Sequence, residues 1–245
     1  MLEIVRITDW NDPRIDEFGE LQNRAYFDPD MLIPMWVIKQ TMQNPSPHRN
    51  DVLLVAVEEG KVLGGTVFHY LPPAHAGFSS ILAVDPEARG KGVAKALHLA
   101  RWETLTEIAK APPRAVFIDV VAPERLSEEE WAKEKEYGFD PRQRRKVFAG
   151  MGFKQLDIEY HQPVGGPDGG PVTNMDLLIY APNLHEVFPL EWVLDTMHAY
   201  WVPWLGSERA HQATDELKMR AKSDPVGLLP PDHACHAEVF NDEVV

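Results

Sequence analysis

The chain has 245 residues, of which 44% are hydrophobic, and a formal net charge of −14. This length suits one large domain, or one domain with an extension, and the hydrophobic fraction is enough for a core. Nonspecific nucleic-acid binding depends on neutralising phosphates with Lys and Arg, so the acidic balance argues against a nucleic-acid partner. The single cysteine, Cys235, excludes an intramolecular disulfide and fits a reducing compartment.

The first residues, Met1-Leu2-Glu3, contain neither the basic region nor the apolar run of a secretory signal. No uninterrupted apolar stretch approaches membrane-spanning length. We therefore expect a cytoplasmic protein with no membrane partner. An acidic surface would also attract a cationic amine, although charge that serves solubility explains the same composition.

Hydrophobic periodicity and turn residues predict alternating helices and strands over the first three quarters of the chain. Strands are expected at 3–7, 51–57, 62–70, 78–84, 115–121, 154–160 and 175–180. Helices are expected at 13–26, 31–42, 93–108, 127–135 and 142–151.

The character of the sequence changes after residue 182. Residues 185–204 are dense in large apolar side chains, residues 208–222 have the pattern of a polar helix, and residues 224–245 form a Pro-rich, acidic tail. We therefore divide the chain into a first domain, 1–182, and a helical extension, 183–245. The aromatic content of the extension indicates that it packs either on its own domain or, as a homodimer contact, on a second subunit.

The segment from Ile81 to Leu97 is the most informative part of the chain. An apolar strand is followed by a proline turn, a short glycine loop and a helix. Gly90 and Gly92 have no side chains, so the backbone of the loop can approach a ligand closely. The helix that follows presents unpaired N–H groups and the positive end of its dipole to this loop, and Lys91 adds positive charge. Such a construction binds phosphate or pyrophosphate.

Two familiar phosphate-binding patterns are absent. The loop lacks the Gly-Lys-Ser/Thr ending of a Walker motif. A dinucleotide fingerprint needs a third glycine, and Lys95 stands at that position.

The remaining pattern, Arg89-x-x-Gly92-x-Ala94 after Val84-x-Pro86, resembles the acyl-CoA loop of the GNAT superfamily of N-acyltransferases. In that family Gln/Arg-x-x-Gly-x-Gly/Ala connects the fourth strand to the third helix. The segment 147–154, Val-Phe-Ala-Gly-Met-Gly-Phe-Lys, resembles the family's later motif, usually Phe-Tyr-x-x-x-Gly-Phe. The order of the predicted elements over residues 1–182 is also the GNAT order.

This resemblance implies an α/β (α+β) fold with a central mixed, mostly antiparallel, twisted sheet flanked by helices, followed here by the helical C-terminal extension. It implies transfer of an acetyl group from acetyl-CoA to a primary amine of a small-molecule or peptide acceptor, by direct attack and without a metal. The alternative is a noncatalytic acyl-CoA-binding sensor or regulatory module. The positions that match the family's coenzyme-binding residues are Leu82, Ala83, Val84, Arg89, Gly90, Lys91, Gly92, Val93 and Ala94.

The chemistry of proton transfer is less defined by the sequence. The family's tyrosine, which protonates the departing thiolate, is replaced by Phe148, and a phenyl ring cannot donate a proton. Tyr160 and Tyr137 are the nearest alternatives in sequence. As general base, Asp119 and Glu124 rank equally, since Asp119 interrupts an apolar strand and Glu124 follows its end.

His69 is a third candidate base, because histidine titrates in a useful range. For each of these candidates a paired structural role is the competing interpretation.

Overall fold

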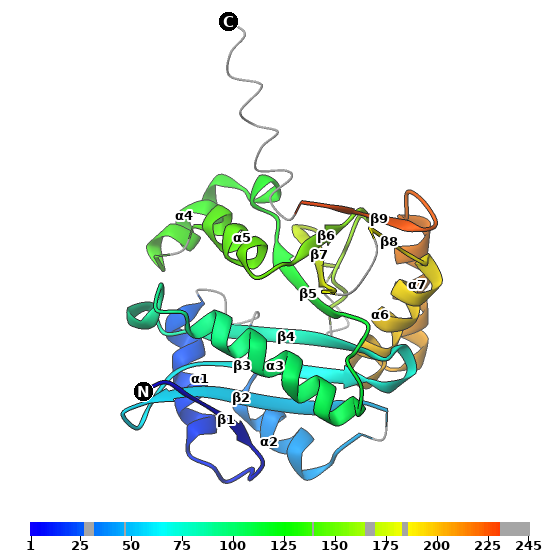
Figure 1. Ribbon diagram of the computed structural model, residues 1–245. Coiled ribbons are helices and arrows are strands. Elements are labelled where there is room, and N and C mark those ends of the chain that lie inside the picture. The colour runs from blue at the N-terminus through cyan, green and yellow to red at the C-terminus, as the bar shows by residue number, and fades with distance from the viewer. Residues whose placement is uncertain (27–31, 47, 139, 165–169, 183–185, 231–245) are drawn as a thin grey trace, which may run out of the picture. The chain divides into compact units, whose positions relative to one another are not determined.

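The structure is a computed structural model that describes residues 1–26, 32–46, 48–138, 140–164, 170–182 and 186–230 (Figure 1). The chain forms two compact units, the first made of residues 1–113 with 136–138 and the second of residues 114–135 with 139–245. Within the described ranges, no helix combines the length and the apolar character needed to cross a membrane. The same ranges contain no group of three or more His, Cys, Asp or Glu side chains placed to hold a metal.

The first unit is an antiparallel sheet with helices on both faces. Its strands lie in the order β1, β2, β3, β4, each hydrogen-bonded to the next. Its elements are β1 (Glu3–Ile7), α1 (Arg14–Ala25), α2 (Met35–Gln43), β2 (Asn50–Glu58), β3 (Lys61–Leu71), β4 (Ala76–Val84) and α3 (Val93–Ala109). These elements confirm the predicted order. Helix α2 begins later than predicted because Pro34, with ψ 136°, is extended and the helix starts after it; residue 31 lies outside the described residues.

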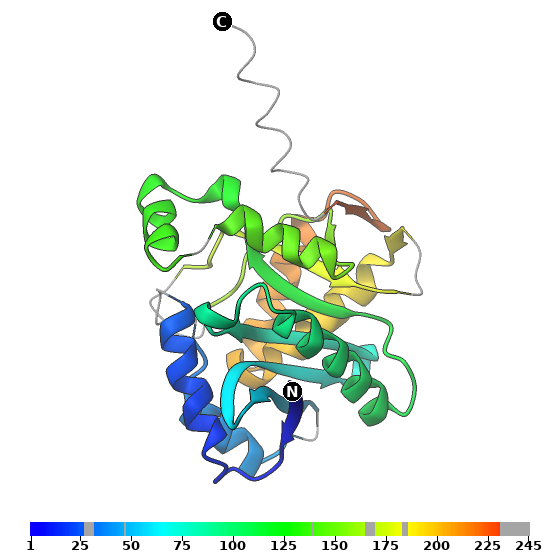
Figure 2. The same ribbon diagram turned by 60° about the vertical axis from the view of Figure 1, so that its left-hand side comes forward.

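Two consecutive glycines in β3 allow helices to pack closely on both faces of this sheet. Consecutive strand residues point to opposite faces. A Cβ atom on Gly64 would lie 2.9 Å from the Ala83 carbonyl oxygen and 3.0 Å from Val93 at the start of α3. A Cβ atom on Gly65 would lie only 2.6 Å from the ring of Phe18 in α1. Figures 1 and 2 show the result, with α3 on one face of the strands and α1 on the other.

Strand β4 contains a bulge opposite β3. Ile81 pairs with Val67 and Ser79 pairs with Phe68, so Ser80 is the extra residue on β4. A bulge of this kind bends the strand and re-aims the side chain that it carries.

The second unit is also built on an antiparallel sheet, with strand order β5, β7, β6, β9, β8. Its elements are β5 (Val116–Val121), α4 (Glu128–Glu136), α5 (Pro141–Gly150), β6 (Lys154–Leu156), β7 (Met175–Tyr180), β8 (Val187–Phe188), α6 (Leu190–Leu205), α7 (Ser207–Met219) and β9 (Val226–Leu229). With the first unit, these elements confirm the predicted fold class, a mostly antiparallel sheet flanked by helices.

The C-terminal region contributes strands as well as helices. Strand β9 pairs with β6, with Leu229 opposite Gln155, and β8 pairs with β9. Residues 226–229 were predicted to belong to a tail, and residues 231–245 of that tail lie outside the described residues. Strand β6 is shorter than predicted and ends at Leu156. Beyond it, Ile158 makes an isolated bridge with Ala221.

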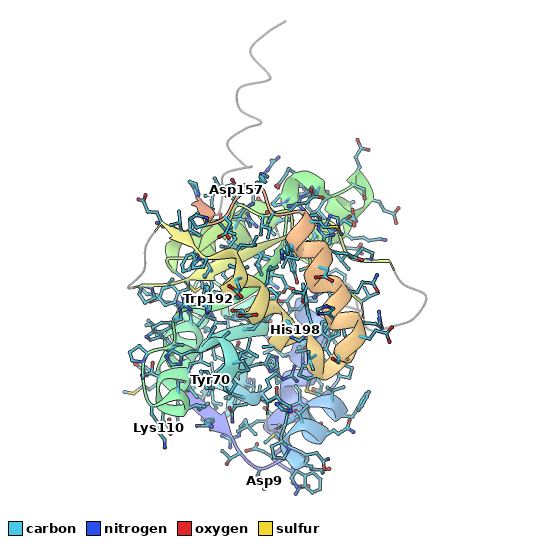
Figure 3. All side chains as sticks on the ribbon, turned by 90° about the vertical axis from the view of Figure 1, so that its right-hand side faces the viewer. Asp9, Tyr70, Lys110, Asp157, Trp192 and His198 are labelled. Carbon is cyan, nitrogen blue, oxygen red and sulfur yellow. The ribbon has the colours of Figure 1, made fainter. Side chains whose placement is uncertain are left out.

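The aromatic residues of α6 pack inside the second unit. Figure 3 shows α6 and α7 side by side, with Trp192 and His198 labelled on α6. The Trp192 ring lies 5.3 Å from Phe117 and 5.4 Å from Phe188, measured between centroids, and Trp201 stacks on Tyr160. This packing within the chain accounts for the burial of these rings. The boundary at residue 182 and the homodimer contact stay predictions.

Gly65→Ala should destabilise the protein, because the added methyl group overlaps the Phe18 ring and backbone of β2. We expect a loss of about 1–3 kcal/mol in the free energy of unfolding, measured by urea denaturation. Gly170→Ala is the matched control, because a Cβ atom there meets nothing within 4 Å. Equal midpoints for the two variants would contradict this account of the helix packing.

Candidate functional site

The turn after β4 is fixed by Asp85. Its carboxylate accepts a hydrogen bond from the Glu87 amide (3.0 Å) and thereby caps the short 3-10 turn Pro86–Ala88. It also accepts a hydrogen bond from Arg24 Nη2 (2.9 Å). Burial raises the pKa of the Asp85 carboxyl, but these hydrogen bonds outweigh burial and hold the pKa below its ordinary value. The carboxylate therefore stays ionised and fixes the backbone where the loop begins.

The two loop glycines have left-handed backbone conformations. Gly90 has φ 75° and Gly92 has φ 83°, a region that L side chains rarely adopt. A Cβ atom on either glycine would meet no other atom within 4 Å. The backbone conformation therefore demands glycine here, and the space beside the loop is open.

The start of α3 supplies hydrogen-bond donors to the same loop. The first helical bond runs from the Ala96 amide to the Gly92 carbonyl (3.0 Å), so the amides of Val93, Ala94 and Lys95 precede it. Among the described residues, no backbone carbonyl accepts a hydrogen bond from the amides of Gly90, Gly92 and Val93. Lys91 and Lys95 are exposed beside them. Backbone donors, the helix dipole and two ammonium groups together favour an anion.

The Arg89 side chain contacts a second segment of the first unit. Its Nη1 donates a hydrogen bond to the Gly138 carbonyl (3.1 Å) within the first unit. The guanidinium therefore ties the loop to residues 136–138. The role of Arg89 in binding the coenzyme stays a prediction.

The strand segment before the loop is anchored by a residue that sequence reasoning missed. The Tyr26 hydroxyl donates a hydrogen bond to the Leu82 carbonyl (2.8 Å). Leu82 pairs with Thr66 in β3, and Ala83 and Val84 pair with the two glycines. No local pattern identifies Tyr26, because it meets β4 only through the packing of α1.

His69 lies in a polar cluster on three neighbouring strands. Its Nδ1 lies 2.5 Å from Asp51 Oδ1 and its Nε2 lies 2.6 Å from Ser80 Oγ, while Arg49 Nε lies 2.7 Å from the same Asp51 oxygen. Burial lowers the pKa of His69, the charge of Arg49 lowers it further, and Asp51 opposes both without reversing the direction. Sequence reasoning found His69 but not Asp51 or Ser80, because register and a bulge bring them together.

Asp119 and Tyr160 meet in the second unit. The Tyr160 hydroxyl donates a hydrogen bond to Asp119 Oδ2 (3.0 Å). Burial raises the pKa of Asp119 to about 6, and the hydrogen bond from Tyr160 opposes this shift. Burial also raises the pKa of Tyr160 well above its ordinary value, helped by the Asp119 charge. The structure therefore pairs two predicted site residues that are distant in sequence.

The other candidates for proton transfer lie elsewhere. Glu124 is exposed on the turn Pro123–Arg125, and no hydrogen bond joins it to Asp119 or Tyr160, all three being residues that the structure describes. Phe148 packs edge-to-face on Phe153, with ring centroids 5.5 Å apart, in a hydrophobic cluster.

The basic helix α5 uses much of its charge inside the second unit. Arg144 pairs with Glu134 (2.8 Å), and the buried Arg145 pairs with Asp176 (2.9 Å). These pairs support a structural role for both arginines.

Comparison with known proteins gives the family. The sequence profile of the acetyltransferase (GNAT) family matches residues 15–139, just over half of the chain. The matched region contains β4, the glycine loop and α3. A sequence comparison with curated proteins finds no match.

Several solved structures share the fold at low sequence identity. A protein from Bacteroides thetaiotaomicron assigned to the GNAT acetyltransferases is 14% identical with a TM-score of 0.57, covering 84% of this chain and 98% of its own. An aminoglycoside 6′-N-acetyltransferase complexed with coenzyme A is 12% identical with a TM-score of 0.51, covering 75% and 98%. A Staphylococcus epidermidis protein described as an acetyltransferase is 14% identical with a TM-score of 0.50, covering 75% and 100%. The fold and the family match agree: this chain belongs to the GNAT family of acetyltransferases.

Proposed function

We propose that this protein transfers an acetyl group from acetyl-CoA to a primary amine, by direct attack of the amine on the thioester. The glycine loop between β4 and α3 carries the proposal. Its two left-handed glycines lead into the amides at the start of α3, and two lysines lie beside them. Backbone amides and ammonium groups of this kind are what a coenzyme diphosphate requires of a binding site.

The coenzyme would be held along one continuous segment. The amides of Gly90, Gly92, Val93 and Ala94 bind the diphosphate. The backbone of residues 82–84 pairs with the pantetheine arm, as in the family that the loop resembles. The thioester oxygen becomes negative during attack and needs a preorganised donor, which we assign to a backbone N–H near Leu82. The coenzyme A complex of the aminoglycoside 6′-N-acetyltransferase supports this choice of ligand.

The acceptor amine must lose a proton during the reaction, and we propose that the Asp119 carboxylate accepts it as general base. A carboxyl with a pKa of about 6 is mostly ionised at neutral pH and can still bind a proton, which suits a general base. Tyr160 holds it in place through the 3.0 Å hydrogen bond. The exposed Glu124 has no such support. The net charge of −14 favours a cationic acceptor, whether a small molecule or a peptide amine.

A second candidate function is a noncatalytic acyl-CoA-binding sensor or regulatory module. The observation in its favour is Phe148, which occupies the position of the family's proton donor and packs in a hydrophobic cluster. Both candidates require the coenzyme, and only the first requires turnover.

Calorimetric titration with coenzyme A should show saturable binding by the unmodified protein, and Gly92→Ala should weaken it about tenfold. A left-handed conformation costs a residue with a Cβ atom roughly 1–2 kcal/mol, so the variant loop should shift its amides. Gly150→Ala, where a Cβ atom has open space and no positive φ is required, should bind as the parent does. The absence of any heat with the parent would overturn the proposal.

Acetyl-CoA incubated with a panel of amines should release free thiol with at least one of them. The panel comprises a polyamine, an aminoglycoside, a small primary amine and a peptide with a free N-terminus. Binding of coenzyme A with no turnover on any member would favour the sensor.

Asp119→Asn should lower that turnover about 100-fold, the effect of removing a general base. A loss of only about twofold would exclude Asp119 from this role. Coenzyme A binding, measured by calorimetry, should be unchanged.

The same variant should alter the pH dependence of stability. The pKa of Asp119 lies near 6 in the folded protein and near its ordinary value of about 3.9 in the unfolded chain. A raised carboxyl pKa stabilises the fold below the unfolded value, and this stabilisation is lost as the pH rises through about 6. Asp119→Asn should therefore be more stable than the parent at pH 8, by about 1–3 kcal/mol. Urea midpoints from pH 4 to pH 8 test this, and a less stable variant at pH 8 would contradict it.

A further inference from the structure

A serine, a histidine and an aspartate line up across three neighbouring strands of the first unit. Asp51 lies on β2, His69 lies directly opposite it on β3, and Ser80 lies on β4. The atoms form a chain of two short contacts, Asp51 Oδ1 to His69 Nδ1 at 2.5 Å and His69 Nε2 to Ser80 Oγ at 2.6 Å. This is the order of contacts in which a base activates a hydroxyl and a third group orients the base.

The chemistry of the three side chains assigns the protons. An ionised carboxylate can only accept hydrogen bonds, so His69 Nδ1 carries the ring proton and donates it to Asp51. His69 Nε2 then has a lone pair, which accepts the hydrogen bond from the Ser80 hydroxyl. The serine proton therefore already points at a base.

The surroundings keep these charge states in place. Burial raises the pKa of Asp51, but the hydrogen bond from His69 and the charge of Arg49 outweigh burial and lower it. The pKa of His69 is lowered, so the ring is neutral at pH 7. The side chains of Asp51 and His69 are 11% and 7% exposed, which shields the pair from water.

The adjacent serine shows what a purely structural role looks like in the same strand. Ser79 is buried, accepts a hydrogen bond from Arg101 Nη1 at 2.6 Å and lies 3.3 Å from the Thr66 hydroxyl. Ser80 is partly exposed, and the bulge turns it to His69 instead. Bulges occur beside active sites because they re-aim a side chain in this way.

We propose that Ser80 is a nucleophile that takes an acyl group from an acyl thioester, with His69 as its base and Asp51 holding the imidazole. The choice of acyl donor rests on the proposed function, in which β4 also receives the coenzyme. Ser80 and Leu82 are two residues apart, about 7 Å along a strand. Ser80 therefore lies on the same stretch of β4 as the proposed thioester site.

The step balances without any further reagent. The bond between Ser80 Oγ and the acyl carbon forms, the carbon–sulfur bond breaks, and the hydroxyl proton passes to His69 Nε2. The imidazolium then gives this proton to the thiolate, which leaves as free thiol. Water attacks the acyl-serine, and Ser80 recovers its proton through His69. The outcome with water is thioester hydrolysis, an activity beyond amine acetylation.

The test is labelling of the full chain with a fluorophosphonate, a reagent that reacts with base-activated serines and needs no coenzyme. Peptide mapping by mass spectrometry should place one label on Ser80 and none on Ser79. Ser80→Ala should abolish it, and Asp51→Asn and His69→Gln should slow it at least tenfold. Ser223→Ala, an exposed serine of the second unit, is the control and should label at the parent rate. Thermal melting checks that each variant is folded. If His69→Gln does not fold, the labelling rate of Asp51→Asn, the smallest change, decides the test.

A second arm uses acetyl-CoA alone. The parent should either accumulate acetyl-Ser80 or release thiol in the absence of any amine, and Ser80→Ala should do neither. Labelling that is absent, or as fast in Asp51→Asn as in the parent, would overturn the proposal. A parent protein that neither accumulates acetyl-Ser80 nor releases thiol without an amine would overturn it too. Coenzyme A binding by calorimetry separates the two proposals, because the fluorophosphonate arm does not depend on it.

Discussion

The close approach of two helices to one strand governs the first unit. At Gly64 and Gly65 the strand presents no side chain to either face, so α3 and α1 settle directly against its backbone. This packing fixes the start of α3 relative to the end of β4. The eight residues of the loop must therefore connect Val84 to Val93 across a fixed separation. Within that span Gly90 and Gly92 take left-handed backbone conformations. The packing of a core thus decides which way the loop amides point.

The same strands carry different polar chemistry on their two faces. On the α3 face, Arg101, His98 and Ser79 form a buried network in which burial lowers the pKa of Arg101 to about 9 and that of His98 to about 3. On the α1 face, His69 and Asp51 hold Ser80. The bulge in β4 separates these two environments by a single residue. A register shift of one position would move Ser79 into the place of Ser80, or Ser80 into the place of Ser79.

The sequence predicted what depends on local patterns and missed what depends on pairing between distant segments. The glycine loop, the strands up to β5 and helix α3 follow from turn residues and periodicity. Strands β8 and β9 are too short to give a pattern, and they exist because β6 offers an edge. The link from Asp119 to Tyr160, the anchor at Tyr26 and the contacts of Ser80 all need the register of strands or the packing of a helix. Composition cannot supply such register.

The position of β9 has a consequence for how the chain is made. Its residues, Val226–Leu229, are synthesised after the other strands that the structure describes, yet they pair with β6, which is made some seventy residues earlier. During translation one side of β6 therefore stays unpaired until residues 226–229 have left the ribosome. An unpaired strand edge is a template for aggregation. The second unit thus completes its sheet late, whereas the described strands of the first unit have all been made by residue 84.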